Sequence, residues 1–335
     1  MNQSHNIAII GAGISGLACA TALNTAGYRV TTFEKSRGVS GRLGTRVTDN
    51  WQCDHGAQYF TASNTEFALE VQRWQQAGVA ALWQPSLQMF DGDKFSQKSS
   101  TKNRYIGVPT NSAPAKFLAQ SLNIQTNVTV DKIERQNDSW QLSSVEHGLN
   151  TQPFDALILA IPAPQAKILL NQCAPDLAKI ATSVKMRGCW TMMCQFNSQL
   201  NLPFDGLFIN NNLLSWVARD GAKQGRASPT KASTSQTNQT ETWVLHASSE
   251  WSETHIEDAP DVVANLMLSA FIQLGGEKPA TFTAHRWRYA DCLAYLNIAC
   301  AWDANLQLGL CGDWLNGGKV EGAWLSGYLL AKKIL

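Results

Sequence analysis

The chain has 335 residues, of which 44% are hydrophobic and 16% are charged, as is typical of a globular protein with one large or two medium domains. Its 27 basic and 26 acidic side chains leave a net charge of +1, which excludes a strong overall attraction to nucleic acid or to a membrane surface. A small-molecule site is therefore the expected function. The eight cysteines include no CxxC pair and no spacing with histidine that is typical of zinc, so we expect reduced thiols and no metal.

The first element, residues 7–23, reads IAIIGAGISGLACATAL, and such an apolar run can also indicate a secretion signal or a membrane anchor. The preceding MNQSHN lacks the cationic residues of a signal peptide, and the run is short and glycine-containing for a membrane span. We therefore expect a cytoplasmic protein. Residues 7–10 should form a buried strand, and a helix should follow to about Ala26, closed by Gly27.

The turn between this strand and helix carries the GxGxxG pattern of a dinucleotide site. Gly11 makes the tight turn, Gly13 lets the backbone approach a pyrophosphate, and Gly16 lets the helix pack on the strand. The pyrophosphate would then lie at the helix N-terminus. The next strand, in YRVTTFEK, ends at Glu34, whose carboxylate can accept hydrogen bonds from ribose hydroxyls.

The stretch KSRGVSGRLGTRV follows directly, and its arginines Arg37, Arg42 and Arg46 suit a diphosphate better in FAD than in NAD. This pattern resembles the flavin-containing amine oxidase superfamily, in which a GGR loop brings its arginine to the FAD pyrophosphate. The motif here is Ser40-Gly41-Arg42, with serine in place of the first glycine. The resemblance implies that Arg42 contacts the pyrophosphate.

Two further segments resemble the renalase branch of that superfamily. CDHGAQYFTA, residues 53–62, is similar to the segment beside the flavin, which implies that Gln58 and Tyr59 contact the flavin. The tail LQLGLCGDWLNGGKVEGAWLSGYLLAKKIL is similar to the closing motif, in which a strand ends at Gly312-Asp313 and a helix begins near Glu321. From the residues alone, Asp313 can accept from ribityl hydroxyls, and a helix starting at 322–323 points its positive end at the flavin.

The resemblance implies an α/β fold like that of p-hydroxybenzoate hydroxylase, with a Rossmann-like FAD-binding domain and an inserted antiparallel-sheet substrate domain. The expected FAD-binding domain is discontinuous and comprises residues 1–65, 121–164 and 281–335, and the expected substrate domain comprises residues 66–120 and 165–280. The residues expected to bind the cofactor are Gly11, Ala12, Gly13, Ser15, Gly16, Glu34, Lys35, Arg42, Gln58, Tyr59, Val130, Asp313, Glu321 and Ala323. Val130 enters this set because its strand would face the adenine.

Within the substrate domain, a helix in EFALEVQRWQQAG should bury Phe67, Val71 and Trp74 on one face. Four apolar stretches, at 189–196, 206–212, 213–220 and 242–248, predict strands of an antiparallel sheet that roofs the flavin. Residues 221–242 are rich in serine, threonine, glutamine and lysine, and are expected to be a mobile surface loop without chemistry that joins two strands.

The renalase resemblance implies an oxidase that takes hydride from misreduced dihydronicotinamide dinucleotides and passes electrons to dioxygen, giving hydrogen peroxide. An amine oxidase acting on a small primary amine remains open, although no aromatic cage is recognisable, and so does a non-catalytic flavin-binding redox sensor. The attachment motif of monoamine oxidases does not appear in the C-terminal third, so non-covalent FAD is expected. The candidate catalytic residues are His246, Tyr59 and Trp287. His55 and His285 are further candidates, and Trp216, Trp243 and Trp324 could either wall a pocket or pack in the core.

Overall fold

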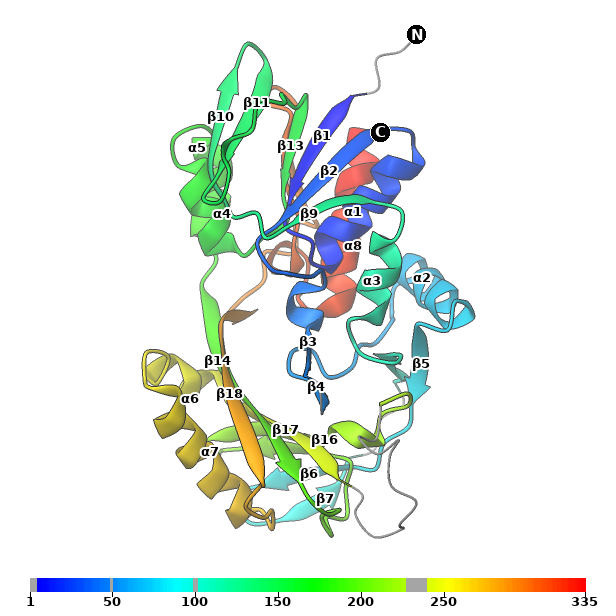
Figure 1. Cartoon of the computed structure of the whole chain (residues 1–335), viewed down its shortest axis with the longest axis vertical. Helices are drawn as coiled ribbons and strands as arrows, with labels where there is room; N and C mark the ends of the chain where they lie inside the picture. Colours follow the sequence, from blue (N-terminus) through cyan, green and yellow to red (C-terminus); the bar gives the residue numbers. More distant parts are fainter. Residues whose placement is uncertain (1–4, 49–50, 99–101, 227–239) are drawn as a thin grey trace.

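A mixed sheet built around the first strand organises one half of the molecule in the computed structural model, which describes residues 5–48, 51–98, 102–226 and 240–335 (Figure 1). Its strand order is β19-β20-β13-β1-β2-β9, with β19 antiparallel to β20 and the other neighbours parallel. The strands are β1 (Asn6–Ile10), β2 (Arg29–Glu34), β9 (Asn123–Thr126), β13 (Ala156–Leu159), β19 (Ala301–Asp303) and β20 (Leu308–Leu310). Every residue of β1 is buried, as expected for a parallel strand covered on both faces.

Helices α1 (Ile14–Thr25) and α8 (Lys319–Ile334) lie together on one face of this sheet (Figure 1). They approach closely because residue 327 is glycine, and a Cβ there would lie 1.9 Å from the Ser15 carbonyl oxygen. The opposite face is covered by a three-stranded sheet and two helices. These elements are β10 (Val130–Gln136), β11 (Ser139–Ser144), β12 (Gly148–Leu149), α4 (Ala163–Leu170) and α5 (Pro175–Thr182).

A second sheet, of seven strands, forms the other half of the molecule in the order β18-β14-β17-β16-β15-β6-β7. Its strands are β6 (Leu87–Asp91), β7 (Phe95–Gln97), β14 (Met186–Phe196), β15 (Gly206–Asn210), β16 (Leu214–Arg219), β17 (Glu241–Ala247) and β18 (Thr281–Cys292). Neighbouring strands are antiparallel except for β6 and β15. Helices α6 (Ser249–Thr254) and α7 (Pro260–Gln273) lie along its outer face (Figure 1).

The hairpin of β3 (Thr45–Val47) and β4 (Gln52–Asp54) projects between the two sheets (Figure 1). Beside it are the strand pair β5 (Ala80–Trp83) and β8 (Arg104–Gly107) and the helices α2 (Thr65–Gln76) and α3 (Ala113–Ala119). Short 3₁₀ turns form at η1 (Gly41–Leu43), η2 (Asp220–Ala222) and η3 (Asp313–Leu315). The hairpin thus brings the segment after β4 to the inner face of the seven-stranded sheet.

The α/β fold with a Rossmann-like part is confirmed, and the second sheet is antiparallel as predicted except for the parallel pair of β6 and β15. The first strand, the helix ending before Gly27 at φ +92°, and the strand ending at Glu34 lie where the sequence predicts them. The four stretches expected to be sheet strands correspond to β14 to β17. The helical face of Phe67, Val71 and Trp74 is buried.

Three details differ from the sequence-based expectation. Helix α8 begins at Lys319, ahead of the expected start near Glu321, after two glycines with φ of +70°. Strand β18, assigned above to the nucleotide-binding part, pairs with β14 in the seven-stranded sheet. Of the loop expected at 221–242, residues 227–239 lie outside the described residues. Residues 223 and 226 have buried side chains, so the expected surface position is wrong for these two residues.

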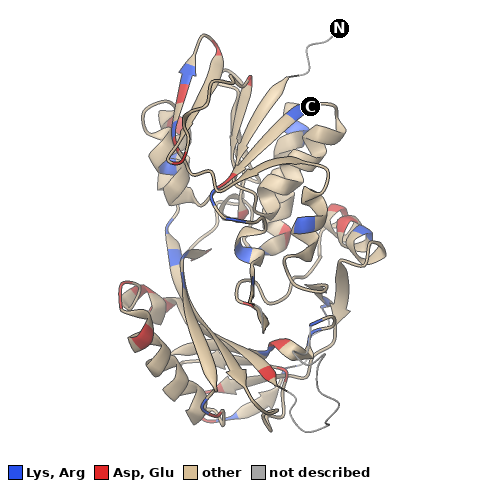
Figure 2. Ribbon diagram, in the orientation of Figure 1, with Lys and Arg blue, Asp and Glu red and all other residues tan. Residues whose placement is uncertain are grey.

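All eight cysteines lie in the described residues and are free thiols. Within the ranges given above, no helix is both long and apolar enough to cross a bilayer, and no cluster of potential metal ligands occurs. Acidic and basic residues are scattered over both halves of the ribbon (Figure 2).

Candidate functional site

The turn after β1 forms a cradle at the N-terminus of α1. Gly11 has φ +105°, and a Cβ there would lie 2.5 Å from the Ala160 carbonyl oxygen, so only glycine fits. A Cβ on Gly16 would lie 2.0 Å from the Gly11 carbonyl oxygen, so glycine is also needed where the first turn of α1 packs against the turn after β1. At Gly13 the position of a Cβ has no atom within 4 Å, so this glycine faces open space.

Two features of the cradle fit the diphosphate of a cofactor such as FAD. The first turn of α1 has neither an acidic residue nor a side-chain cap, so its amide groups keep their positive potential. The hydroxyl of Ser15 is buried and finds no hydrogen-bond partner in the described residues. A buried hydroxyl without a partner is costly unless a ligand or water supplies one, so the residues present suit a bound phosphate group.

Glu34, at the end of β2, lies beside this cradle. Its two carboxylate oxygens accept hydrogen bonds from the backbone amides of Ala12 and Ser36, both at 2.8 Å, and each retains a free lone pair. The Glu34 carbonyl accepts from the amide of Val128 at 2.9 Å, which brings the β9–β10 turn alongside, and Val130 begins β10 two residues later. Lys35 is exposed. The geometry therefore places a buried carboxylate where the sequence predicts ribose recognition.

Arg42 and Asp313, which the sequence assigns to different parts of the cofactor, lie together. The guanidinium of Arg42 forms a two-point pair with the Asp313 carboxylate, with 2.9 Å between Nη1 and Oδ2, and Nη1 also donates to the Ala290 carbonyl oxygen at 3.1 Å. The pair joins η1 to η3 and so connects the loop after β2 to the end of β20. Their separate contacts with pyrophosphate and ribityl chain stay predictions.

On α8, Glu321 and Ala323 also make contacts within the protein. One Glu321 carboxylate oxygen accepts from the backbone amides of Ser63 at 2.7 Å and Asn64 at 2.6 Å. Ala323 is buried against the core around Phe67. Both residues therefore join α8 to the start of α2, close to the helix end that the sequence predicts to face the flavin.

The segment after β4 holds the next two predicted residues. The buried Gln58 amide donates to the carbonyl oxygens of Asp54 at 2.6 Å and Gly56 at 3.1 Å, and its Oε1 accepts from the Lys223 ammonium at 3.0 Å. Its side chain is thus fully engaged within the protein. The Tyr59 ring packs against Trp83 and Trp216, with ring centroids 5.8 Å and 6.0 Å away.

Opposite this segment, the register of the seven-stranded sheet aligns four side chains in a row across β16, β17, β14 and β18. Trp216 lies opposite His246, His246 opposite Thr191, and Thr191 opposite His285. Directly paired residues share a face of a sheet, so this polar row, comprising Trp216, His246, Thr191 and His285, lies on one face. Trp287, two residues along β18, lies on the same face.

The His55 ring, from the segment after β4, lies at the β18 end of the polar row. His55 stacks on Trp287 with centroids 5.0 Å apart, and His285 lies 4.8 Å from His55 and 4.5 Å from Trp287. The Trp287 indole donates to the His55 carbonyl oxygen at 2.9 Å. The structure therefore gathers the candidates His246 and Trp287 on one face, with Tyr59 against Trp216 at its other end.

Several buried polar atoms around this face lack partners within the part of the chain that the structure describes. They are Thr191 Oγ1, His246 Nε2, His55 Nδ1 and Trp216 Nε1. Unpaired buried groups are uncommon, and their concentration at one place is typical of a surface that binds a ligand or ordered water. Tyr59 lies at the edge of the same region, against Trp216, so the face is a candidate substrate site.

The histidines of this face are held in the neutral form. Burial lowers the pKa of His246 to about 3, with the charges of Lys223 and His55 acting in the same direction. Burial, His285 and Arg46 likewise lower the pKa of His55 to about 4. The pKa of His285 is lowered by burial and by Arg46. At neutral pH these imidazoles can each offer one donor and one acceptor to a ligand.

Two of the tryptophans considered as pocket walls lie elsewhere. Trp243 is fully buried on the opposite face of the sheet, where its indole donates to the Glu241 carboxylate at 2.8 Å. Trp324 packs in the core with Phe67 and stacks on Tyr328. Both are core residues.

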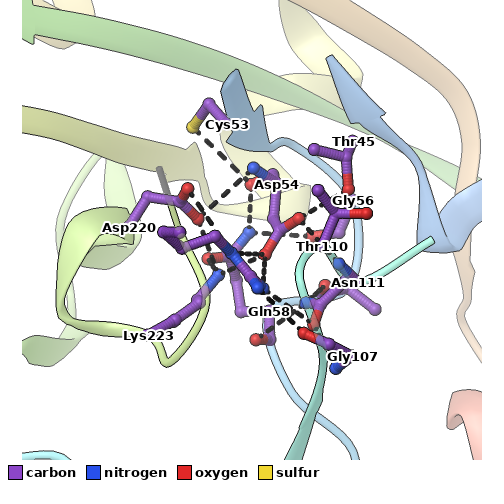
Figure 3. Close-up of polar contacts among 12 residues, drawn as sticks. Thr45, Cys53, Asp54, Gly56, Gln58, Gly107, Thr110, Asn111, Asp220 and Lys223 are labelled. Atoms are coloured by element: carbon purple, nitrogen blue, oxygen red, sulfur yellow. Dashed lines mark hydrogen bonds and ion pairs between the residues drawn. The ribbon is translucent and has the colours of Figure 1, made fainter. Parts of the chain in front are cut away.

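The sequence reasoning missed a buried ionic cluster next to Gln58, formed by Asp54, Asp220, Lys223 and Arg226. Figure 3 shows Asp54, Asp220 and Lys223 together beside Gln58. The only sequence signal is the spacing of Asp220 and Lys223, which places opposite charges three residues apart. Composition does not indicate the cluster, because Lys223 and Arg226 stand near the start of residues 221–242, a stretch that otherwise has few apolar side chains to bury.

Comparisons with known proteins identify the families that the two parts of the chain match. Residues 9–71 match the NAD(P)-binding Rossmann-like domain family, and residues 78–335 match the family described as flavin containing amine oxidoreductase. Among curated proteins, a bifunctional protein of tRNA 5-methylaminomethyl-2-thiouridine biosynthesis from Magnetococcus marinus is 28% identical over 210 residues, which cover 49% of this chain and 31% of that protein. An L-amino-acid oxidase from Siganus canaliculatus is 35% identical over 69 residues, covering 20% and 13% of the two chains. The chain thus spans less than a third of either relative.

Solved structures show the same fold over the whole chain. A protein assigned as a protoporphyrinogen oxidase from Exiguobacterium sp. 255-15 superposes with a TM-score of 0.77 at 11% identity, covering 99% of both chains. Cyclohexylamine oxidase from Brevibacterium oxydans IH-35A gives a TM-score of 0.73 at 12% identity, covering 99% of this chain and 98% of that one. At these identities the likeness shows the fold alone.

Proposed function

The chain belongs to the family described as flavin containing amine oxidoreductase, and from this premise we propose that it is an FAD-dependent oxidase of dihydropyridine dinucleotides. Its substrates would be misreduced isomers of dihydronicotinamide dinucleotides, with the hydride at the wrong ring carbon. The cradle after β1 and Glu34 would hold the FAD, which would supply the redox chemistry: acceptance of that hydride at N5 and transfer of two electrons to dioxygen, giving hydrogen peroxide. FAD would be held without a covalent bond, and the protein would act in the cytoplasm.

The observation that carries this proposal is the set of unpartnered neutral groups around the polar row. A dihydronicotinamide ring is flat and bears a carboxamide, which offers both donor and acceptor atoms. His246 and Thr191 can each donate or accept, and the Trp216 indole can donate. These residues would bind the carboxamide and orient the ring, and hydride transfer depends on such orientation more than on a proton-transferring pair.

The charges around the face also favour a neutral ring over an ammonium ion. Its nearby carboxylates in the described ranges, Asp54 and Asp220, are already paired with Lys223 and Arg226. A protonated amine entering the site would lose its hydration without gaining a carboxylate partner.

An amine oxidase is the second candidate, because it agrees with the family description and with the fold shared with cyclohexylamine oxidase. Tyr59 and Trp216 supply aromatic surface, but their centroids lie 6.0 Å apart at an angle of 58°, which is a contact between the rings and leaves no slot between them. A non-catalytic flavin-binding redox sensor is the third reading, and reoxidation in air separates it from an enzyme.

Anaerobic mixing of the holoprotein with candidate donors tests the proposal. We expect misreduced NADH isomers to bleach the flavin absorption within seconds, and normal NADH, benzylamine and putrescine to do so at least about a hundredfold more slowly, since a misplacement of about 1 Å can cost that much. Air should then restore the flavin with formation of peroxide. Fast bleaching by an amine alone would replace the proposal by the second candidate, and slow reoxidation without peroxide would favour the sensor.

A further inference from the structure

The buried ionic cluster lies between three chain segments that are distant in sequence. The Lys223 ammonium contacts Asp54 Oδ2 at 3.0 Å and Asp220 Oδ1 at 2.9 Å, and the Arg226 guanidinium pairs with Asp54. All four side chains are at most 2% exposed. Two cations therefore balance two carboxylates in the interior, where an unbalanced charge would be costly.

The pKa values of the two carboxyl groups depend on the other charges of the cluster. Burial alone would raise the pKa of Asp54, but Lys223 and Arg226 outweigh it and hold that pKa below its usual value. Burial raises the pKa of Asp220, which has weaker contact with Arg226, at 3.8 Å. The cluster is thus centred on Asp54, the last residue of β4.

Two paths of hydrogen bonds lead from the cluster to the backbone of residues 56–58 (Figure 3). On the first, Lys223 donates to Gln58 Oε1, and the Gln58 amide donates to the Asp54 and Gly56 carbonyl oxygens. On the second, Arg226 donates to Asn111 Oδ1 at 3.2 Å, and the Asn111 amide donates to the carbonyl oxygens of Ala57 at 2.7 Å and Gln58 at 3.0 Å.

The segment that contains Lys223 and Arg226 packs closely against residues 107–111, the segment that contains Asn111. Arg226 Nη1 donates to the carbonyl oxygens of Gly107 at 2.8 Å and Pro109 at 2.7 Å. Gly225 has φ +79°, and a Cβ there would lie 2.8 Å from a Val108 methyl carbon. The side chains of Lys223 and Arg226 therefore lie in the interior, held in one position relative to the segment after β4, while residues 224 and 225 between them are exposed.

We propose that Lys223 is a positioning residue for the cofactor, acting through Gln58 to fix the backbone of residues 56–58 against which the flavin ring would lie. Its ammonium orients the Gln58 amide, whose two donors then hold the turn after Asp54. The proposal rests on the proposed function, in which this segment borders the flavin. It assigns a role in the site to a residue from a stretch that composition marks as surface.

Substitutions of Lys223 test the role by cofactor binding and by the flavin spectrum. Lys223→Met removes the charge and keeps the length, and should weaken FAD binding about tenfold or more and alter the flavin absorption bands, because a hydrogen bond to a charged group is lost. Lys223→Arg should restore much of the affinity and the parent spectrum. Lys167→Met, on the exposed side of α4, is the matched control and should leave both unchanged.

Gln58→Met keeps all four charges paired and therefore guards against a variant that fails to fold. If Lys223 acts through Gln58, this variant should show the same loss and the same spectral change, and the double variant should bind FAD no more weakly than either single one. A folded Gln58→Met with parent FAD affinity and spectrum would overturn the proposal, as would additive losses in the double variant. A parent protein that binds no FAD would instead overturn the proposed function.

Discussion

Ser40 has an unusual backbone conformation at the point where the loop after β2 meets the nucleotide cradle. Its φ is 116°, a region that glycine adopts readily and serine rarely, and its amide donates to the Ala12 carbonyl oxygen at 3.0 Å. The resemblance noted in the sequence has glycine at this position. The serine is therefore retained at a cost in backbone strain.

We expect Ser40→Gly to raise the free energy of unfolding by about 1 kcal/mol, because relief of the strain exceeds the added entropy of the unfolded chain. Urea unfolding followed by tryptophan fluorescence measures the change. Ser36→Gly, four residues earlier and without a positive φ, is the control and should be neutral or slightly destabilising. A loss of stability in Ser40→Gly would show that the serine side chain contributes more than its backbone costs.

His246 makes the stability of the protein depend on pH. Burial lowers its pKa from 6.5 to about 3, so between these values the unfolded chain binds a proton that the native protein does not. Stability then falls as the pH drops below 6.5, by up to about 1.4 kcal/mol per pH unit, or about 2 kcal/mol at pH 5. His246→Gln should reduce the loss between pH 7 and pH 5 by that amount.

Urea midpoints at pH 7 and pH 5 measure this loss for each variant. His147→Gln, which replaces an exposed histidine at the end of the three-stranded sheet, serves as the control and should behave like the parent. Equal losses in His246→Gln and the parent would mean that the imidazole is protonated in the native protein.

At the scale of elements, β1, α1 and β2 were predictable because each depends on residues close together in sequence. An apolar run, three glycines and a carboxylate at the strand end determine the cradle locally. The polar row was not predictable, since Thr191 meets His246 and His285 only through the pairing of β14 with β17 and β18. Sequence patterns indicate strands but not which strands become neighbours.

The ionic cluster was missed for the same reason. Lys223 and Asp54 are separated by 169 positions, and the lysine lies in a stretch whose composition indicates solvent exposure. A buried cation is recognisable only from its partners, which composition does not report. The predicted start of α8 differs from the observed one by only a few residues. The helix begins at Lys319, directly after two glycines with positive φ, whereas the sequence predicts a start near Glu321.

Replacing parts of the segment between β16 and β17 tests whether the buried cations at its start, and not the rest of the segment, contribute to stability. A glycine-serine sequence of equal length in place of residues 228–238 should leave stability and flavin content near those of the parent, because their composition offers little to bury. The same replacement of residues 222–226 should lower the free energy of unfolding by about 3–5 kcal/mol, because two buried carboxylates lose their cations. Thermal unfolding and flavin absorption provide the readouts, and equal behaviour of the two variants would contradict the assignment of the cluster.

At the scale of the whole molecule, the expected cofactor contacts come from three parts of the chain that only the fold brings together. The cradle and Glu34 belong to the first sheet, Gln58 and Tyr59 to the segment facing the second sheet, and Asp313 follows β20. A ligand that binds this native arrangement and not the unfolded chain stabilises the molecule, by about 2.7 kcal/mol at a hundredfold excess over its dissociation constant.

We therefore expect added FAD to raise the thermal midpoint of the apoprotein and to keep unfolding in one transition. In Glu34→Ala the rise at a given FAD concentration should be smaller, because a charged hydrogen-bond acceptor contributes about 1.5–3 kcal/mol, equivalent to at least about tenfold in affinity. The comparison uses the rise in midpoint rather than its absolute value, since Glu34 also accepts from the Ala12 and Ser36 amides in the absence of a ligand. Glu277→Ala, at an exposed position, is the control and should respond to FAD like the parent. A midpoint that ignores FAD would contradict the cofactor assignment, whereas an undiminished response in Glu34→Ala would contradict only the ribose contact.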